Sequence, residues 1–321
     1  MANNDAIPGV WQMSGGPSMR PYADVFLEHE VALIGPGDAG EWRAGRPDAD
    51  FDGSFVRRFA TEVRIGDVFL LRTASAQISA VGIVASEYLY LSQFDDVNGW
   101  DLQHGRRVRW FRLPVPYDFG SPVFGTNPSR FSTVSTESAV EYARKFINSP
   151  PTSWQTVPLP GLPPEQPPLE EVPEALRDIV GHGQDLLSLY GDERSFGEPP
   201  LEDELLTHLV VPFLRALGWP PELVAIKWRR IDVCLFKTLP RTSENCALVL
   251  EAKRLGMGVE GALGQARAYL DNLGIRRDIV VTDGIRYRLY AHDQAFTPVA
   301  YANMARLKKP AVDLFERITK T

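Results

Sequence analysis

The feature that most constrains the fold is a proline-rich segment near the middle of the chain. Residues 149–173 read SPPTSWQTVPLPGLPPEQPPLEEVP, with nine prolines in 25 residues. Proline has no backbone N–H and fixes φ, so such a segment favours extended polyproline conformations over helices and central strands. We therefore expect a semi-rigid linker at 149–173, with one domain at 1–148 and another at 174–321.

Length and composition are consistent with a soluble two-domain protein. The chain has 321 residues, 44% of them hydrophobic and 23% charged, which is enough for two cores. It contains no apolar stretch of membrane-spanning length, and its start lacks the pattern of a secretory signal. The two cysteines, Cys234 and Cys246, form neither a metal-spaced motif nor a disulfide framework. These features predict a cytoplasmic protein with no membrane partner.

The net charge of −7 is unevenly distributed along the chain. Residues 149–200 carry 2 basic and 9 acidic side chains, whereas 201–321 carry 18 basic and 14 acidic ones. Local charge matters more than the total for binding a polyanion. The mildly basic C-terminal part is therefore compatible with a nucleic-acid partner.

The first domain is predicted to be mainly β and to form a small barrel. Its apolar segments are short, rich in β-branched and aromatic residues, and punctuated by glycine. These segments are VALIG at 31–35, DVFLLRTA at 67–74, ISAVGIVASEYLYL at 78–91 and RRVRWFRLP at 106–114. A helix at 137–148, ESAVEYARKFIN, is expected to close the domain.

The second domain is predicted to be α/β, with a mixed sheet flanked by helices. A helix at 174–191 should pack onto it, and 201–219 (LEDELLTHLVVPFLRALGW) has amphipathic helical spacing that Pro212 would kink or divide. The remaining pattern alternates strands with helices. Strands are expected at 231–236, 247–253, 278–284 and 285–292, and helices at 259–274 and 311–320.

Two of these strands carry the residues with the clearest chemical use. Asp232 lies in an apolar strand, and 19 residues later a second strand ends in Glu251 and Lys253, which point to the same side. Two carboxylates suit Mg²⁺, and a lysine beside them can orient water and offset charge on a phosphate. We predict that Asp232 and Glu251 bind metal and that Lys253 is catalytic, although an isolated Glu-x-Lys is more often a solvated ion pair.

The segments IDV and LVLEAK, in this order, resemble the PD-(D/E)xK nuclease superfamily. LEDELLTHLVVPFLRALGW is similar to the opening helix of nuclease domains in type I restriction subunits and Mrr-like enzymes. That resemblance implies a catalytic Glu202, with Asp203 and Glu204 as alternatives. GQARAYLDNLG resembles the superfamily's Gln-x-x-x-Tyr helix, which implies a catalytic Gln265 and a nucleic-acid contact at Tyr269. A surface pair on a helix is the alternative for these two.

In the first domain, VRIGDVFLLRTASAQISAVGIVASEYLY resembles PUA-like barrels, in particular EVE-type domains. The resemblance implies binding of RNA or of a flipped, modified DNA base in a pocket with aromatic residues. The loop at 34–42 could line that pocket, and Asp101 and Gln103 could read polar base edges.

A second pattern in this domain is typical of nucleic-acid binding. HGRRVRWFRLP interleaves arginines with aromatic residues, and arginines contact phosphates while aromatic rings stack on bases. Core packing is the alternative for each tryptophan, including Trp11. The predicted nucleic-acid-binding residues of the first domain are Trp42, Trp100, Arg106, Arg107, Arg109 and Trp110.

A reader barrel joined to a nuclease suggests a modification-dependent, type IV-like restriction endonuclease of phage defence that cuts DNA with Mg²⁺. The chain has no G-x-x-x-x-G-K-[ST] motif, so cutting would not need NTP hydrolysis by this chain. Two alternatives remain: a defence nuclease that senses RNA or a nucleotide, and a non-catalytic nucleic-acid-binding protein on a nuclease scaffold. Double-strand cutting with one site per chain would favour a homodimer.

Overall fold

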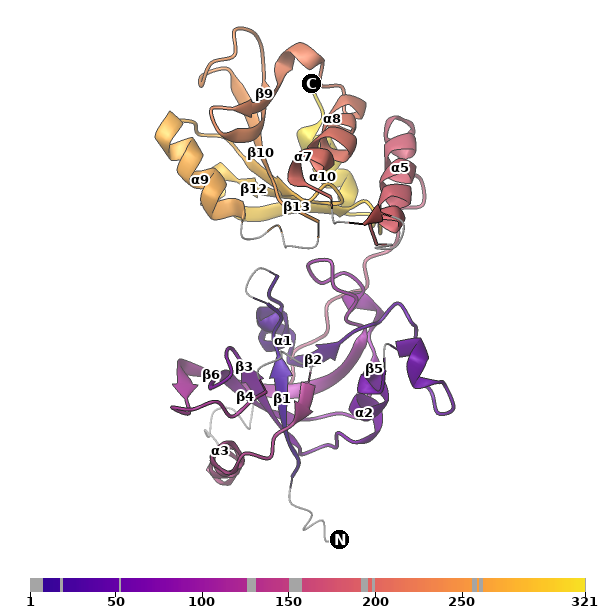
Figure 1. Cartoon of the computed structure of the whole chain (residues 1–321), viewed down its shortest axis with the longest axis vertical. Helices are drawn as coiled ribbons and strands as arrows, with labels where there is room; N and C mark the ends of the chain where they lie inside the picture. The colour runs from indigo at the N-terminus through magenta and orange to yellow at the C-terminus, as the bar shows by residue number, and fades with distance from the viewer. Residues whose placement is uncertain are drawn as a thin grey trace. The chain divides into compact units, whose positions relative to one another are not determined.

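The structure is a computed structural model that describes residues 8–17, 20–51, 53–125, 131–149, 158–191, 196–197, 200–255, 259 and 262–320. The chain divides into two compact units, residues 1–165 and residues 166–321 (Figure 1). Each unit contains one sheet with helices packed on it, so the protein is a mixed α/β protein. None of the described helices is both long and apolar enough to cross a membrane.

The first unit contains a curled seven-stranded sheet in the order β2-β6-β4-β3-β1-β7, with β5 paired to β6. Its longest strand, β6, pairs with β2, β4 and β5, all antiparallel, whereas β1 and β3 are parallel. The strands β1 and β7 were not predicted from the sequence. The strands are β1 (Val10–Ser14), β2 (Val31–Ile34), β3 (Val68–Arg72), β4 (Gln77–Val84), β5 (Leu89–Tyr90), β6 (His104–Asp118) and β7 (Phe131–Thr133).

Among the described residues of the first unit, three α-helices accompany this sheet. The predicted closing helix is α3 (Glu137–Asn148). The other two, α1 (Ala23–His29) and α2 (Phe55–Thr61), were not predicted, because seven residues are too few to show a helical period. Each buries an aromatic side chain in the core: Phe26 stacks with Trp110 at 6.4 Å between ring centroids, and Phe59 stacks with Phe69 at 6.3 Å.

The two described ends of the proline-rich segment are tied to different units. Part of the segment, 150–157, lies outside the described residues. On the first unit, the carbonyl of Pro160 accepts a hydrogen bond from Arg107 at 2.6 Å. On the second unit, Leu169 N–H donates to the carbonyl of Leu307 at 3.0 Å, and Lys309 N–H donates to that of Pro167 at 2.9 Å. Proline carbonyls remain good acceptors, so the segment can dock, and these two bonds form an isolated antiparallel bridge between Pro168 and Lys308.

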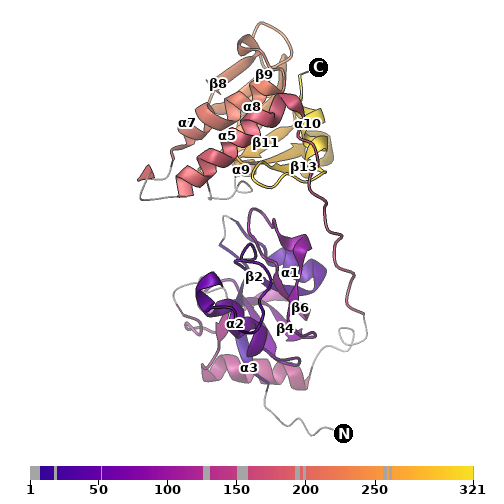
Figure 2. The same cartoon turned by 90° about the vertical axis from the view of Figure 1, so that its right-hand side faces the viewer.

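The second unit has a six-stranded sheet in the order β13-β12-β11-β10-β9-β8 (Figure 2). The β10–β11 pair is parallel, which requires a crossover, and helix α9 (Ala262–Leu273) provides it. The other pairs are antiparallel, and the edge strands β8 and β13 were not predicted. The strands are β8 (Val224–Trp228), β9 (Ile231–Phe236), β10 (Cys246–Ala252), β11 (Ile279–Thr282), β12 (Arg286–Ala291) and β13 (Thr297–Asn303).

Helices cover both faces of this sheet. One core joins the sheet to α5 (Glu174–Gly191), α8 (Val211–Ala216) and α10 (Ala311–Ile318), and a separate core joins it to α9. Successive side chains of a strand point to opposite faces of the sheet. Val249 of β10 packs in the core with α9. Glu251, two residues further on, therefore shares the face of the sheet that α9 covers.

The helix that precedes the second sheet is divided as its proline predicts. It begins as α7 (Glu202–Leu205), continues as a π-helical turn over Leu206–Val210 and ends as α8. Pro212 lies directly after the π turn and has no N–H to donate to the preceding turn. The helix nevertheless buries Leu209 and Phe213, so its N-terminal acids are held at a fixed place beside the sheet.

Candidate functional site

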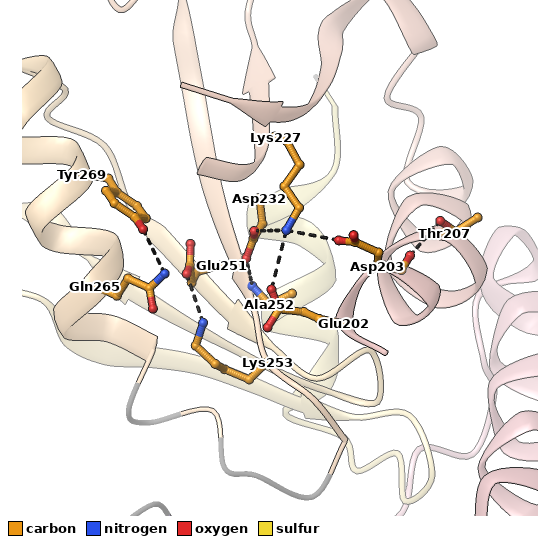
Figure 3. A network of polar contacts seen from close by, with 10 residues as sticks. All are labelled: Glu202, Asp203, Thr207, Lys227, Asp232, Glu251, Ala252, Lys253, Gln265 and Tyr269. Carbon is orange, nitrogen blue, oxygen red and sulfur yellow. Dashed lines mark hydrogen bonds and ion pairs between the residues drawn. The ribbon is translucent and has the colours of Figure 1, made fainter. Parts of the chain in front are cut away.

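Asp232 and Glu251 lie side by side on neighbouring strands of the second sheet. Val233 of β9 pairs with Leu250 of the antiparallel β10, so the next positions bring the two acids opposite each other. The backbone N–H of Ala252 donates to Asp232 Oδ2 at 2.8 Å, which holds that carboxylate against β10 (Figure 3). Asp232 is only 4% exposed and Glu251 only 1%. The two acids predicted to bind metal thus form one buried pair.

Lys253 follows β10 directly and pairs with Glu251. Its Nζ lies 3.1 Å from Glu251 Oε1, and the lysine side chain is 18% exposed. The other oxygen, Glu251 Oε2, is buried and has no hydrogen-bond partner among the described residues. A buried polar atom without a partner destabilises the fold, so this oxygen is available to a ligand.

The surroundings of Glu251 disfavour its charge. Burial and, after it, the neighbouring charge of Asp232 raise the pKa of Glu251 to about 7 from an ordinary value of 4.5. The charge of Lys253 and its hydrogen bond act in the opposite direction. Without a bound cation, Glu251 therefore takes up a proton near neutral pH.

This raised pKa predicts how stability depends on pH in metal-free buffer. Between pH 4.5 and 7 the unfolded carboxyl ionises while the folded one stays protonated, so rising pH favours unfolding. The free energy of unfolding should fall by up to about 3 kcal/mol over this range because of Glu251 alone. Urea titrations of the wild type and of Glu251→Gln, at several pH values in EDTA, measure this contribution as their difference. A constant difference between the two proteins would contradict the expectation.

Lys227 of β8 is a site residue that the sequence did not reveal. Its Nζ lies 2.7 Å from Asp232 Oδ1, 3.2 Å from Asp203 Oδ1 and 3.6 Å from Glu202 Oε1 (Figure 3). Burial alone would lower the pKa of Lys227, but its hydrogen bonds with Asp232 and Asp203 and their charges raise it above its usual value. The ammonium is thus a cation held among three carboxylates. Strand β8 was not predicted from the sequence, so the residues next to Lys227 in the fold could not be predicted either.

The acids of α7 separate into two groups. Glu202 and Asp203 both reach the Lys227 ammonium, and the charge of Glu202 also contributes to the raised pKa of Glu251. Glu204 turns away, because its Oε2 accepts the N–H of Leu201 at 2.6 Å. A carboxylate on a free N–H at the start of a helix is a capping interaction. Glu202, the first choice from the sequence, is therefore at the site and Glu204 is not.

Gln265 and Tyr269 stand on one side of α9. Gln265 Nε2 donates to Tyr269 Oη at 3.1 Å, as expected for residues four apart on a helix. Figure 3 places the two side chains beside Glu251 and away from Lys227. They are near the acid pair and are hydrogen-bonded to each other.

The oxygen atoms of this site are compatible with Mg²⁺. Among the described ranges, no group of three or more His, Cys, Asp or Glu side chains forms a ready metal cage. Magnesium needs no such cage, because it typically takes one or two carboxylates and keeps several waters. Asp232 and Glu251 could supply these carboxylates, and the Lys227 ammonium shows that a cation is favoured between Asp232 and the acids of α7.

The structure corrects two predictions in the first unit, Arg106 and Trp110. Arg106 is fully buried, and its guanidinium donates to the backbone carbonyls of Phe59, Ala60 and Ser86 at 2.9 to 3.0 Å. Trp110 is 5% exposed and its Nε1 donates to the carbonyl of Val31. Inward-facing residues of a half-buried strand pack in the core whatever their chemical type. Neither side chain is placed to contact a nucleic acid.

The next two arginines of β6 are half-buried. Arg107 donates to the carbonyls of Glu30, His29 and Pro160, at 3.3, 3.4 and 2.6 Å, so most of its hydrogen-bonding capacity is used within the protein. The positive charge of Arg109 opposes a rise in the pKa of Glu30 that burial causes. Both arginines therefore interact within the protein, in addition to the phosphate contacts predicted for them.

The two tryptophans proposed to read a base differ in their surroundings. Trp100 Nε1 donates to the carbonyl of Arg20, whose guanidinium lies 3.5 Å from the centre of the indole ring. One face of Trp100 is therefore covered by Arg20. Trp42 Nε1 has no hydrogen-bond partner among the described residues, although the atom is buried and the side chain is only half-buried. Trp42 is thus the better candidate to bind a ligand.

Trp42 is linked to a polar and aromatic cluster that contains His104. Tyr88 Oη forms a hydrogen bond with His104 Nδ1 at 2.8 Å. It also accepts a hydrogen bond from the backbone N–H of Trp42 at 3.1 Å. Tyr90 Oη donates to the carbonyl of Gly37 at 2.9 Å and its ring packs edge-on against His104. Burial lowers the pKa of His104, which favours the neutral ring. This cluster was not predicted from the sequence, although the segments ASEYLY and LQH contain its residues.

Gln103 lies beside this cluster and has a free acceptor. It is 4% exposed, its Nε2 is 3.4 Å from Asp38 Oδ1, and its Oε1 has no partner among the described residues. A Cβ on Gly37 would lie 1.6 Å from that Oε1, so only glycine fits there. Asp101 holds the same loop, because its backbone carbonyl and Oδ2 accept the N–H groups of Gly37 and Asp38. The loop at 34–42 is therefore built around Gln103.

Comparisons with known proteins give limited information. None of the curated proteins compared with the chain matches it. A solved fragment described as an HsdR subunit of a type I restriction enzyme from Vibrio vulnificus YJ016 is 21% identical, with a TM-score of 0.27. The match covers 38% of this chain and 26% of that chain, so it does not establish a shared fold. Residues 11–127 match the family model described as "Domain of unknown function (DUF8426)", which is less than half of the chain.

Proposed function

We propose that this protein is a Mg²⁺-dependent DNA endonuclease of the PD-(D/E)xK type, whose second unit cuts and whose first unit recognises a modified base. The observation that carries the proposal is the buried acid pair, Asp232 and Glu251, with Lys253 next to it. Acids on adjacent strands with a lysine two residues beyond the second acid are the parts that phosphodiester hydrolysis needs in one place.

Each side chain of the site has a distinct role in this proposal. Asp232 and Glu251 would hold Mg²⁺, which when bound supplies Lewis-acid polarisation of a phosphate oxygen. Lys253 favours the ionised form of Glu251, orients the attacking water and stabilises negative charge on the phosphate. Glu202 adds negative charge that favours a cation at the site. Gln265 and Tyr269 lie beside Glu251 (Figure 3), where they would contact the substrate.

Recognition by the first unit is supported by the two unpartnered atoms near the His104 cluster. Trp42 Nε1 is a donor, and the Trp42 ring packs edge-on against Tyr88, which stacks with His104. Gln103 Oε1 is an acceptor beside Gly37, whose carbonyl Tyr90 binds. A flipped base is held by stacking and by hydrogen bonds at its polar edge, so it needs both kinds of group. We propose that Trp42, Gln103 and their neighbours receive the modified base. Cutting both strands would then require two copies of the chain.

The function is tested by incubating the full-length protein with duplexes that carry different cytosine modifications, or none, in Mg²⁺ or in EDTA. We expect a modified duplex to be cut in Mg²⁺, the unmodified one to be cut much more slowly, and neither to be cut in EDTA. A parallel single-stranded RNA substrate should remain intact. The Glu204→Gln variant is a matched control, since Glu204 caps a helix beside the site.

The possible failures of this experiment are distinguishable. Equal cutting of all duplexes would remove the reader role of the first unit but leave the nuclease. Cutting of RNA instead of DNA would favour an RNA-directed defence nuclease. Tight binding of DNA without cutting under any divalent cation would indicate a binding protein on a nuclease scaffold.

A further inference from the structure

The turn between β8 and β9 has an unusual combination of conformation and sequence. Trp228 pairs with Ile231, so the hairpin loop consists of two residues, Arg229 and Arg230. Both have a left-handed backbone, with φ of 51° and 76°. Two-residue loops with positive φ at both positions strongly prefer Asn-Gly, because a left-handed conformation brings Cβ too close to the following carbonyl oxygen and only Gly and Asn adopt it readily. The sequence places two arginines where the backbone favours the smallest residues.

These arginines are not explained by internal packing. Both are exposed, and neither takes part in an ion pair among the described residues of the second unit. The Arg229 guanidinium lies 4.7 Å from the centre of the Trp228 ring, a contact with its own neighbour in sequence. The charge of Arg229 also acts on Glu244, whereas no ion pair joins either arginine to a described carboxylate. A strained backbone that carries exposed charge is typical of functional positions.

The turn lies next to the acid pair. Arg230 precedes Asp232 by two residues, so their Cα atoms are within roughly 7 Å along the chain. On the other arm of the hairpin, Lys227 reaches Asp232 with its ammonium at 2.7 Å (Figure 3). The hairpin is thus anchored to the site at Lys227, and its tip carries two guanidinium groups into solvent beside the site.

We propose that the Arg229–Arg230 turn binds the phosphodiester backbone of duplex DNA next to the bond that the second unit cuts. This inference rests on the proposed nuclease function. Guanidinium groups suit phosphate oxygens because they donate two parallel hydrogen bonds and stay charged at every working pH. Charge complementarity selects the partner, since two exposed cations beside buried acids attract a polyanion and hold it over the site.

The decisive variant replaces the turn by the residues that its backbone prefers, Arg229→Asn with Arg230→Gly. Relief of strain should raise the melting temperature by about 2–6 °C. The loss of two phosphate contacts should weaken binding of a duplex in EDTA about tenfold at 0.1 M salt and reduce the salt slope by about 2. Fluorescence anisotropy over a salt series measures both. If the turn had only a structural role, a variant with a higher melting temperature would not bind DNA more weakly.

Two controls accompany this variant. Arg229→Lys with Arg230→Lys keeps the charge and should keep most of the salt slope, with no rise in melting temperature. Arg317→Asn on α10 removes an exposed arginine that pairs with Asp313, and it should leave DNA binding unchanged. If the wild type binds and cuts duplex DNA while the Asn-Gly variant keeps its affinity and salt slope, this inference is wrong and the nuclease proposal stands. If the wild type neither binds nor cuts duplex DNA, both are wrong.

Discussion

Replacing Glu251 with glutamine is expected to lower the rate of DNA cleavage at least about a hundredfold while the protein remains fully folded. A carboxylate that helps to hold Mg²⁺ contributes several kcal/mol to the stabilisation of the transition state, and an amide is a much weaker ligand. The fold does not need this charge, because the pKa of Glu251 is already raised to about 7 by burial and by Asp232. The melting temperature at pH 7.5 should therefore stay constant or rise.

Cleavage rates under single-turnover conditions and thermal melts of the same preparations test this expectation together. Glu204→Gln, which removes a neighbouring charge from a capping position, should cut at the wild-type rate. Asp232→Asn should lose activity as well, but it also weakens the pairing with Lys227 and so is a less clean variant. A Glu251→Gln protein that cuts at the wild-type rate would remove Glu251 from the catalytic site.

Replacing Arg106 with methionine is expected to destabilise the first unit by about 3–5 kcal/mol. Methionine can fill the space of the aliphatic part of the side chain, but it leaves the buried carbonyl of Phe59 and the partly buried carbonyls of Ala60 and Ser86 without these donors. Each such orphaned group costs about 1–3 kcal/mol. Arg106→Lys should recover only part of the loss, since an ammonium cannot reproduce the planar fork of the guanidinium.

Chemical denaturation followed by tryptophan fluorescence measures this loss, because Trp110 lies in the same core. The matched control is Arg112→Met on the same strand, whose side chain is 61% exposed and pairs with Asp24 at the surface. That change should cost less than about 1 kcal/mol. If Arg106→Met were as stable as Arg112→Met, the three backbone contacts would not be supporting the fold.

The contrast between Arg106 and Asp232 shows where sequence reasoning succeeds. Asp232 and Glu251 were predicted on two apolar strands that the nuclease resemblance implies to be adjacent, and the structure pairs these strands. The burial of Arg106 could have been predicted from the same alternation, because Val108 and Trp110 lie on its side of β6. The prediction failed because the arginine was interpreted by its charge instead of by its place in the strand.

The contacts of Lys227, in contrast, could not be predicted from the sequence. It lies on β8, an edge strand of five residues, and its φ of 52° interrupts the regular alternation that identifies strands. Its partners Glu202, Asp203 and Asp232 come from a helix and another strand, and no local pattern connects them. Contacts of this kind depend on the packing of α7 against the sheet, which only the folded structure provides.

The ammonium of Lys227 has a practical consequence for preparing this protein. Acidic clusters that depend on a divalent ion for folding unfold when a chelator removes the ion. Here Lys227 already neutralises part of the charge of Glu202, Asp203 and Asp232 from within the chain. Protein expressed in metal-depleted medium, purified through EDTA and stored without divalent ions should therefore keep its native fold. Such a stock gives an inactive and intact starting point from which each divalent ion can be added and compared.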